Sequence, residues 1–410
     1  MVVLGVLVLV LARGLPDISG VLPGTSSADA TSLPSSPAAA TAPSFAPVAD
    51  APDQHEPLQS KVAPPKPIKA SNVEAVWINH PSDEQKKELE RLVSLIGVDN
   101  QEVIKTATPK AESGDANYQY LLAAAHTNES SQYSRDPRGQ SYLEKALYWY
   151  KEASALGHPM AQFNVGQFYR LAPGNVIQRD IDEAIRWYSM AADNPLSAGD
   201  AENELGRIYE YGEYKPKDIQ RALDYYKTGA ERGNAYAQNN YASMLYNGTA
   251  GPRNIPEATK WLQRAAEQDS TMAQLNLALA YKRGRVTGQP DYNNFLDWAH
   301  KAAKGGYIPA MIELGNFYRS GESGEINNKQ AAAWFRQAAL KKNPEGQFLF
   351  AEMYEQGLGV PRDSIQAYLY YSLAKEGSYA MATGSLDALS KKMSPSELDH
   401  AQKMVRALKE

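Results

Sequence analysis

The pattern that decides the fold lies in residues 346–374, which read G-Q-F-L-F-A-E-M-Y-E-Q-G-L-G-V-P-R-D-S-I-Q-A-Y-L-Y-Y-S-L-A. A small residue opens it, a second small residue, Ala351, follows five positions later, and Tyr354 lies three further on. These positions share one face of a helix, and Gly357 is a suitable helix stop. Asp363 is a suitable N-cap for a second helix. The stretch therefore predicts a helix, a loop and a second helix.

The first half of this pattern recurs along the chain, which is the signature of a repeat architecture. The small residues that open the copies are Ala116, Ala161, Ala201, Ala237, Ala273, Ala310, Gly346 and Ala380. Small residues at the second position let another helix approach closely, and a Tyr eight positions after the opener fills the space beyond them. A glycine eleven positions after the opener ends the helix in every complete copy but one, where Ala172 replaces it.

The second half of the pattern recurs as well. Its aromatic slot holds Trp149, Trp187, Tyr225, Trp261, Trp298, Trp334 and Tyr370. The predicted N-caps are Asp180, Asp218, Asn254, Asp291, Asn327 and Asp363. A reciprocal capping box is expected where an acid or amide side chain lies three residues after the N-cap, as at Glu183, Glu257, Gln330 and Gln366. We expect the Trp and Tyr slots to form the core, with a sugar-stacking groove as the alternative interpretation.

These matched positions resemble the Sel1-like repeat, a relative of the tetratricopeptide repeat, over roughly 300 of the 410 residues. The resemblance implies an all-α, right-handed α/α superhelical solenoid, because a single hairpin cannot bury both of its faces but a stack can. The loops 171–180, 284–291 and 321–327 depart from the family pattern, since they lack its G-x-G-V run.

The N-terminal residues differ from the repeats. Residues 1–12 are apolar except for Gly5. A run of this length fits the apolar core of a signal peptide and is too short to span a membrane. We assign 1–13 to a signal peptide or a truncated membrane anchor. Residues 14–72 are rich in Pro, Ala and Ser, and no Lys or Arg occurs between 14 and 60, so we predict a disordered linker.

Three further segments complete the predicted domain organisation. Residues 73–110 are a helical lead-in that begins with the capping box of Ser82 and Gln85. Residues 111–379 hold about seven repeats. Residues 380–410 form C-terminal capping helices, the second of which begins at Ser394.

The composition excludes several kinds of site. A net charge of −5 argues against a nucleic-acid binder. The chain has no cysteine, so it has no thiol nucleophile and no Cys-ligated metal. The six histidines show no metal-ligand spacing, and neither a P-loop nor a G-x-S-x-G nucleophile elbow is present. We therefore predict no enzyme activity and no catalytic, cofactor or metal residues.

The remaining candidate site is a stripe on the first helix of each repeat, three, six and nine residues after its opener. These positions share a face opposite the packed one, so we expect the stripe to face solvent and to line the concave side of the array. Its candidate protein-binding residues are Asn164, Gln167, Arg170, Glu204, Arg207, Glu210, Asn240, Ser243, Tyr246, Asn276, Lys282, Glu313, Asn316, Arg319, Glu352 and Glu355. A merely solvated face is the alternative for any single residue.

The resemblance implies a non-enzymatic scaffold of the bacterial cell envelope. It would bind proteins through this groove in the assembly of a secretion, polysaccharide-export or motor complex. We expect no nucleic-acid partner, and membrane contact only through the N-terminal segment, which would anchor the protein in the inner membrane with its body in the periplasm. The alternatives are a secreted repeat protein that acts on host or competitor cells, an enzyme of cell-wall chemistry and a cytoplasmic regulator.

Overall fold

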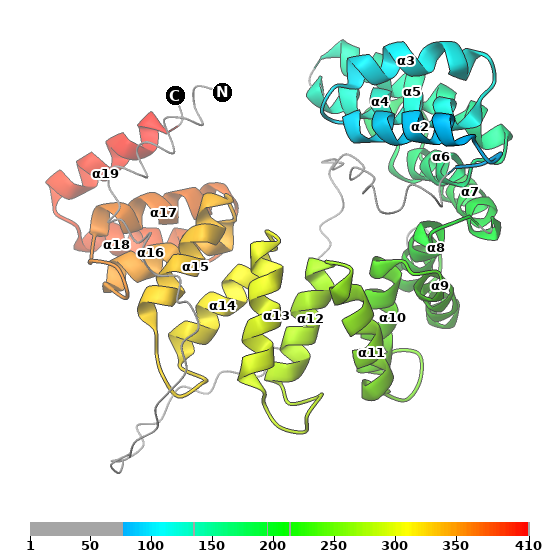
Figure 1. Ribbon diagram of the computed structural model, residues 1–410. Helices are drawn as coiled ribbons and strands as arrows, with labels where there is room; N and C mark the ends of the chain where they lie inside the picture. Colours follow the sequence, from blue (N-terminus) through cyan, green and yellow to red (C-terminus); the bar gives the residue numbers. More distant parts are fainter. Residues whose placement is uncertain (1–76, 134–135, 195, 213–214, 409–410) are drawn as a thin grey trace. The chain divides into compact units, whose positions relative to one another are not determined.

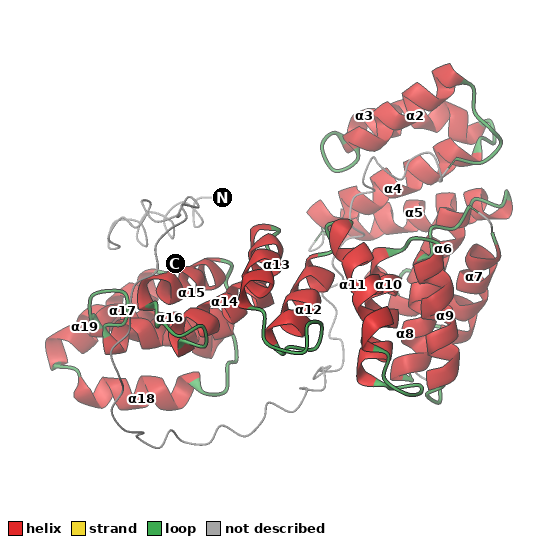
Figure 2. Ribbon diagram, turned by 60° about the horizontal axis from the view of Figure 1, so that its bottom comes forward, coloured by secondary structure: helices red, strands yellow, loops and turns green. Residues whose placement is uncertain are grey.

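The computed structural model describes residues 77–133, 136–194, 196–212 and 215–408. The predicted signal peptide or anchor (1–13) and the predicted linker (14–72) lie outside these residues. The described residues belong to two compact units, 77–325 and 326–408, which we call the N-terminal and C-terminal units (Figure 1). Throughout the described ranges the regular elements are helices, and no strand occurs (Figure 2). The predicted all-α fold is therefore confirmed.

The N-terminal unit is a series of antiparallel helices joined by short loops. They are α2 (Asp83–Leu95), α3 (Asn100–Glu112), α4 (Ala116–Gln132), α5 (Pro137–Ala155), α6 (Pro159–Leu171), the short 3₁₀ helix η2 (Pro173–Asn175), α7 (Ile181–Asp193), α8 (Asp200–Tyr211), α9 (Ile219–Glu231), α10 (Ala235–Asn247), α11 (Ile255–Glu267), α12 (Thr271–Lys282), α13 (Tyr292–Lys304) and α14 (Ile308–Ser320).

The C-terminal unit continues the same alternation. Its helices are α15 (Asn328–Leu340), α16 (Pro344–Gln356), α17 (Ser364–Glu376), α18 (Ala382–Lys392) and α19 (Pro395–Ala407). Both α18 and α19 pack against α17. In the described part of the chain, no helix combines the length and the hydropathy that a membrane crossing needs.

The helices begin where the sequence predicts. The predicted N-cap side chains accept a backbone N–H from the first turn of their helices, as Asp180 does from Glu183 and Asn254 from Glu257. The reciprocal half of the expected capping boxes does not form in α7, α11, α15 and α17. Complete boxes form in α2, between Ser82 and Gln85, and in α19.

The helices also end as predicted. Gly212, Gly248, Gly321 and Gly357 adopt left-handed backbone conformations at the ends of α8, α10, α14 and α16, with φ between 69° and 71°. Such conformations favour glycine because it has no Cβ. Ala172, which replaces the glycine at the end of α6, adopts the same conformation with φ of 47°. The geometry of the helix end is therefore retained without the residue that best suits it.

In the α6–α7 and α8–α9 hairpins, the small residue of the first helix meets an aromatic ring of the second. A Cβ built at Gly166 would lie 2.7 Å from the Tyr188 ring, and one built at Gly206 would lie 2.6 Å from the Tyr226 ring. Both rings are fully buried. They immediately follow the Trp slot, whose members up to Trp298 are only half-buried. The slot residues of these copies still pack against the core clusters, so the slot belongs to the edge of the core, while the next side chain points between the helices.

Successive hairpins are joined by a recurring buried glutamine on the first helix. Gln162 donates to the carbonyl of Ser154, Gln238 to that of Ala230 and Gln274 to that of Ala266. Each bond reaches back to the end of the preceding helix and satisfies one of the carbonyls that a helix C-terminus leaves free. Gln119 makes the same bond, so Tyr118 rather than Ala116 occupies the opening position of the first repeat.

Figure 1 shows how the hairpins of the N-terminal unit are arranged. Helices α6, α8 and α10 lie on the inner side of the arc of this unit, and α7, α9 and α11 lie on its outer side. Helix α10 contacts both α8 and α12 directly. The first helices of consecutive repeats therefore form one continuous inner surface.

Candidate protein-binding surface

The candidate residues come from first helices, but the structure divides them between the two units. Residues from Asn164 to Arg319 lie on α6, α8, α10, α12 and α14 of the N-terminal unit. Glu352 and Glu355 lie on α16 of the C-terminal unit. We call the first set, together with its neighbours on the same helix face, the inner stripe.

The inner stripe is less accessible than the sequence suggests. Asn164, Arg170 and Glu204 are buried, and the other thirteen candidates in both units are half-buried. The expectation of a solvent-facing stripe is therefore wrong for these three residues. The cause is the close packing of neighbouring first helices, which bond to one another across the stripe.

The section of the stripe on α6 and α8, which we call the charged section, is held by a buried ion pair. Arg170 Nη1 lies 2.5 Å from Glu204 Oε2, and the two side chains are 5% and 10% exposed. Arg207 Nη1 approaches the other oxygen of Glu204 at 3.5 Å. One carboxylate thus joins cations from two repeats, in surroundings where a broken pair is strongly destabilising.

Two further carboxylates of α8 belong to the charged section. Asp200 accepts a hydrogen bond from Asn234 Nδ2 at 2.9 Å, and burial raises the pKa of Asp200 to about 6. Glu210 accepts a hydrogen bond from the Tyr226 hydroxyl at 2.6 Å. The charged section therefore uses its charged groups to hold its own helices together.

The section on α10 and α12, which we call the neutral section, is built from amides. Asn276 Nδ2 donates to Asn239 Oδ1 at 2.8 Å, and Asn239 Nδ2 donates to Asn240 Oδ1 at 3.3 Å. Asn240 Nδ2 then donates to Asn203 Oδ1 at 2.9 Å. Asn203 Nδ2 donates to Glu204 Oε1 at 3.3 Å, which ends the chain at the buried ion pair.

This carboxamide chain crosses three repeats and has one direction. Each internal amide donates one N–H toward Glu204 and accepts one bond from the amide before it. An amide has two N–H donors and an oxygen with two lone pairs, so Asn203 and Asn240 each keep one N–H and one lone pair, whereas Asn239 also directs an N–H at Met272 Sδ. The chain therefore fixes the orientation of these side chains without using them up.

On α12 and α14 the stripe becomes charged again. Lys282 Nζ lies 2.8 Å from Glu313 Oε1 and 3.0 Å from Glu322 Oε1. Arg319 donates to Asn316 Oδ1 at 3.2 Å. Lys282 and Glu313 occupy the same repeat positions as Arg170 and Glu204, so the two ion pairs are equivalent bonds between neighbouring repeats.

The candidates in the C-terminal unit follow the same rule. Glu355 accepts a hydrogen bond from the Tyr371 hydroxyl at 2.9 Å, as Glu210 does from Tyr226. Lys392 on α18 also lies 3.1 Å from Glu355. Glu355 therefore connects three helices of this unit.

Sequence reasoning missed four residues of the inner stripe. Asn203 and Asn239 lie two positions after the repeat opener, and Tyr236 and Met272 lie one position before it. The recurrence of Asn at the second position in two successive repeats was a usable signal. Nothing in the sequence showed that these amides bond across repeats, because the bonds join residues 37 positions apart.

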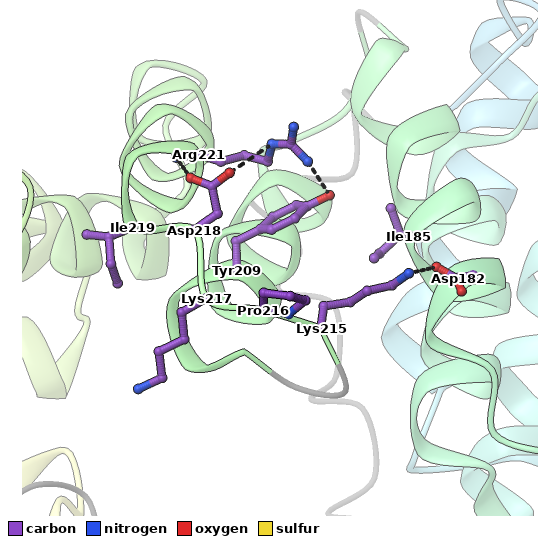
Figure 3. Close-up of a pocket in the computed structure, with 9 residues that line it drawn as sticks. All are labelled: Asp182, Ile185, Tyr209, Lys215, Pro216, Lys217, Asp218, Ile219 and Arg221. Carbon is purple, nitrogen blue, oxygen red and sulfur yellow. Dashed lines mark hydrogen bonds and ion pairs between the residues drawn. The ribbon is translucent and has the colours of Figure 1, made fainter.

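A separate open basin of about 560 Å³ lies at the loop side of α7, α8 and α9 (Figure 3). Arg221 donates to the Tyr209 hydroxyl at 3.0 Å, and its guanidinium lies over the Tyr209 ring. Lys215 forms an ion pair with Asp182 across the basin, and Lys217 points away from the other labelled side chains. The basin therefore holds internal pairs and no catalytic constellation.

The buried histidines are structural. His158 caps α6 by accepting the Ala161 N–H, and its ring stacks on Tyr120 at 4.5 Å. Burial lowers the pKa of His158 to about 3 and that of His126 to about 4, so both are neutral at physiological pH. Within the described ranges, no three acidic or histidine side chains gather in a way that could hold a metal ion. The described surface is thus suited to binding through hydrogen bonds and apolar contact.

Comparisons with known proteins agree with this architecture. The chain matches the Sel1 repeat family over seven consecutive segments, 117–158, 159–195, 199–234, 235–270, 271–307, 308–343 and 344–379. The crystal structure of a Sel1 repeat protein from Oxalobacter formigenes is similar with a TM-score of 0.54 and 24% identity, covering 78% of this chain and 87% of that one. This likeness concerns the fold.

Two curated relatives match with lower coverage. Chitin synthase regulatory factor 3 of Schizosaccharomyces pombe is 25% identical, over 63% of this chain and 32% of the relative. The uncharacterized protein NMB1327 of Neisseria meningitidis serogroup B is 26% identical, over 63% of this chain and 44% of the relative. The chain thus spans less than half the length of these relatives.

The seven matched segments begin and end at the hairpins that the structure shows, and together they cover more than half of the chain. Stacks of such hairpins are modules for protein–protein interaction. The chain belongs to the Sel1 repeat family.

Proposed function

We propose that this protein is a non-enzymatic scaffold that holds a partner protein against the inner stripe of its N-terminal unit. The observation that carries the proposal is the carboxamide chain from Asn276 to Glu204, which aligns polar side chains of three repeats on one surface. A surface assembled from several repeats suits a partner that is itself extended. The half-exposed Asn240 and Asn276 of this chain supply hydrogen-bond donors and acceptors to that partner.

The names of the relatives support a role without catalysis. Chitin synthase regulatory factor 3 and the chitin synthase regulator SKT5 of Saccharomyces cerevisiae are named as regulators of an enzyme. We take the same kind of role, an adaptor that acts on other proteins, as the proposal for this chain. Its partner is a protein that belongs to a larger assembly.

We further propose that the scaffold works at the cell envelope. The apolar run 1–12 and the following segment without Lys or Arg support this location, since translocated flanks of an anchor are poor in positive charge. In this arrangement the repeats serve the assembly of a secretion, polysaccharide-export or motor complex. Fractionation of the native cells with N-terminal sequencing tests the location. A cleaved protein in the medium would favour the secreted alternative, and a soluble cytoplasmic protein would contradict both.

Photo-crosslinking in the native host tests the scaffold itself. Probes placed at the half-buried Ser243 and Asn316 report on the inner stripe, and a probe at the exposed Lys260 on α11 is the matched control. We expect a distinct protein to be captured from both stripe positions and not from Lys260. Equal capture from all three positions, or none above background, would contradict the proposed function.

A further inference from the structure

The inner stripe changes its chemistry along the N-terminal unit. On α10 it presents Tyr236, Asn239, Asn240, Ser243 and Tyr246, which are all uncharged. On α12 the same positions hold Met272, Leu275, Asn276 and Leu279, and a charge returns only at Lys282. On α8 these positions hold Asp200, Glu204, Arg207 and Glu210 beside a single amide, Asn203. The neutral section is therefore a local feature and not a general property of the repeats.

Two large apolar side chains are exposed in the neutral section. Tyr236 is 41% exposed and Met272 is 38% exposed, and each is the second residue of its helix. Asn239 Nδ2 lies 3.3 Å from Met272 Sδ, so the apolar group adjoins the carboxamide chain. An exposed apolar group that is bordered by oriented polar groups is typical of an interaction site.

The charged groups on either side of the neutral section have partners within the protein. Glu204 is shared by Arg170 and Arg207, and Lys282 is shared by Glu313 and Glu322. A charged group on a ligand would compete with these pairs, and it would meet no opposite charge on α10. An uncharged ligand would not compete with them, so charge complementarity favours a neutral occupant for this section.

We propose that the neutral section binds an uncharged, extended peptide segment of the partner protein, with one large apolar side chain packed on Tyr236 and Met272. The backbone of that segment bonds to the remaining N–H and lone pairs of Asn240 and Asn276, whose donor and acceptor pair matches the N–H and C=O of a peptide unit. This inference rests on the proposed function, because it names the class of ligand for the same inner stripe.

The test uses the full chain and a displayed library of random peptides of about twelve residues, a length that suits an extended peptide ligand. Selected peptides are synthesised, and their Kd is measured at about 50 and about 500 mM NaCl, because salt screens ionic contacts. We expect peptides with one large apolar residue, no net charge and a Kd that changes less than about twofold between the two salt concentrations.

Two matched variants locate the binding site. Met272→Glu places a charge beside the apolar contact and should weaken binding by roughly tenfold or more. Met190→Glu makes the same change on α7, at a methionine that is itself 48% exposed, and should leave the Kd unchanged. Circular dichroism melting of both variants checks that the fold is retained. Equal weakening by the two variants would overturn the inference.

The remaining outcomes separate this inference from the proposed function. One outcome is the selection of charged peptides whose binding depends on salt and is lost in Arg207→Ala. This result would overturn the inference of an uncharged ligand but would leave the inner stripe as the binding surface. Peptides that bind equally well to Met272→Glu, Arg207→Ala and Asn316→Asp would contradict both proposals. Failure to select any peptide above background would overturn this inference alone, since crosslinking in the host tests the scaffold independently.

Discussion

The charged section on α6 and α8 and the neutral section on α10 and α12 have the same backbone design but opposite chemistry. In the charged section, neighbouring first helices are joined by the buried pair of Arg170 and Glu204. In the neutral section they are joined by amide bonds such as the one from Asn276 to Asn239. The difference shows that the hairpin pattern leaves the bonds between repeats free to vary. One section holds itself together with charge, and the other keeps its polar groups available.

The largest expected difference between the sections comes from removing one bond in each. Glu204→Leu removes the buried carboxylate that Arg170 and Arg207 share and should lower the free energy of unfolding by about 3–5 kcal/mol. Asn240→Ala removes neutral hydrogen bonds and should cost about 1 kcal/mol. Urea denaturation followed by Trp fluorescence measures both.

A double variant controls this first comparison. Replacing Arg170 and Glu204 together by leucine removes both charges, so it should recover much of the stability that Glu204→Leu loses. Equal losses for Glu204→Leu and Asn240→Ala would mean that the ion pair contributes no more than an amide bond.

The second comparison concerns the small residue inside each hairpin. Gly206→Ala brings a Cβ to 2.6 Å from the Tyr226 ring, which must move, so we expect a loss of about 2 kcal/mol. In the α10–α11 hairpin the same position already holds Ala242. Ala242→Gly should cost about 1–2 kcal/mol, because helix propensity falls and a buried methyl group is lost. Thermal melting of both variants measures these effects.

A compensating change identifies the cause of the Gly206→Ala loss. The ring that follows the aromatic slot is Tyr226 in α9, whereas the equivalent residue in α11 is Leu262. Combining Gly206→Ala with Tyr226→Leu copies the second hairpin and should be less destabilising than the sum of the single changes. Simple additivity would show that the contact with the ring is not responsible.

The third comparison is a pH dependence that only the charged section should show. Burial raises the pKa of Asp200 to about 6, so the protonated carboxyl group favours folding, and the stability it contributes is lost as pH rises from about 4 through 6. Asp200→Asn should therefore be more stable than the parent by about 1–2 kcal/mol at pH 7, with a smaller difference at pH 4. Tyr236 occupies the equivalent position in the neutral section, so Tyr236→Phe should show no such change between these pH values.

Comparing each variant with the parent at every pH removes the contribution of the buried histidines. The pKa values of His126 and His158 are lowered by burial to about 4 and about 3. The neutral forms of both histidines favour folding, so the stability that they contribute is lost as pH falls below about 6.5. This pH dependence is opposite in sign to that of Asp200, whose contribution is lost as pH rises. A stability difference between Asp200→Asn and the parent that is constant from pH 4 to 7 would contradict the raised pKa.

The smallest expected effect compares two helix ends. Ala172, at the end of α6, adopts φ of 47° with a Cβ, whereas Gly248 ends α10 at φ of 70° without one. Ala172→Gly should raise the free energy of unfolding by about 0.5–1 kcal/mol, and Gly248→Ala should lower it by about 1 kcal/mol. Paired urea titrations resolve the two signs. A loss of stability in Ala172→Gly would show that its methyl group makes a compensating contact.

Much of the fold could be predicted because the repeat pattern is local. The N-caps, the glycine helix ends and the small residues that face a second helix each follow from residue types at fixed offsets. The core aromatics could not be assigned in the same way. Trp187 and Tyr188 are neighbours in sequence, and only the rotation of α7 against α6 shows that Tyr188 is fully buried while Trp187 is half-buried.

The candidate site was predictable only in outline. Offsets of three, six and nine selected the helix face correctly, but they gave no information on burial. Arg170 looked solvent-facing because its offset places it opposite the packed face, and the structure buries it against Glu204, a residue 34 positions away. Bonds across such separations depend on the relative translation of two helices, which no local pattern specifies.

The sequence by itself determined that this protein is a stack of helical hairpins, because helix periodicity, caps and glycine stops act within one repeat. It also determined which helix of each hairpin would present a polar stripe. Only the tertiary structure decided which of those polar groups are committed to one another and which keep hydrogen-bonding capacity. The reason is physical: the pairings that separate the charged section from the neutral section form between repeats, after the helices have packed.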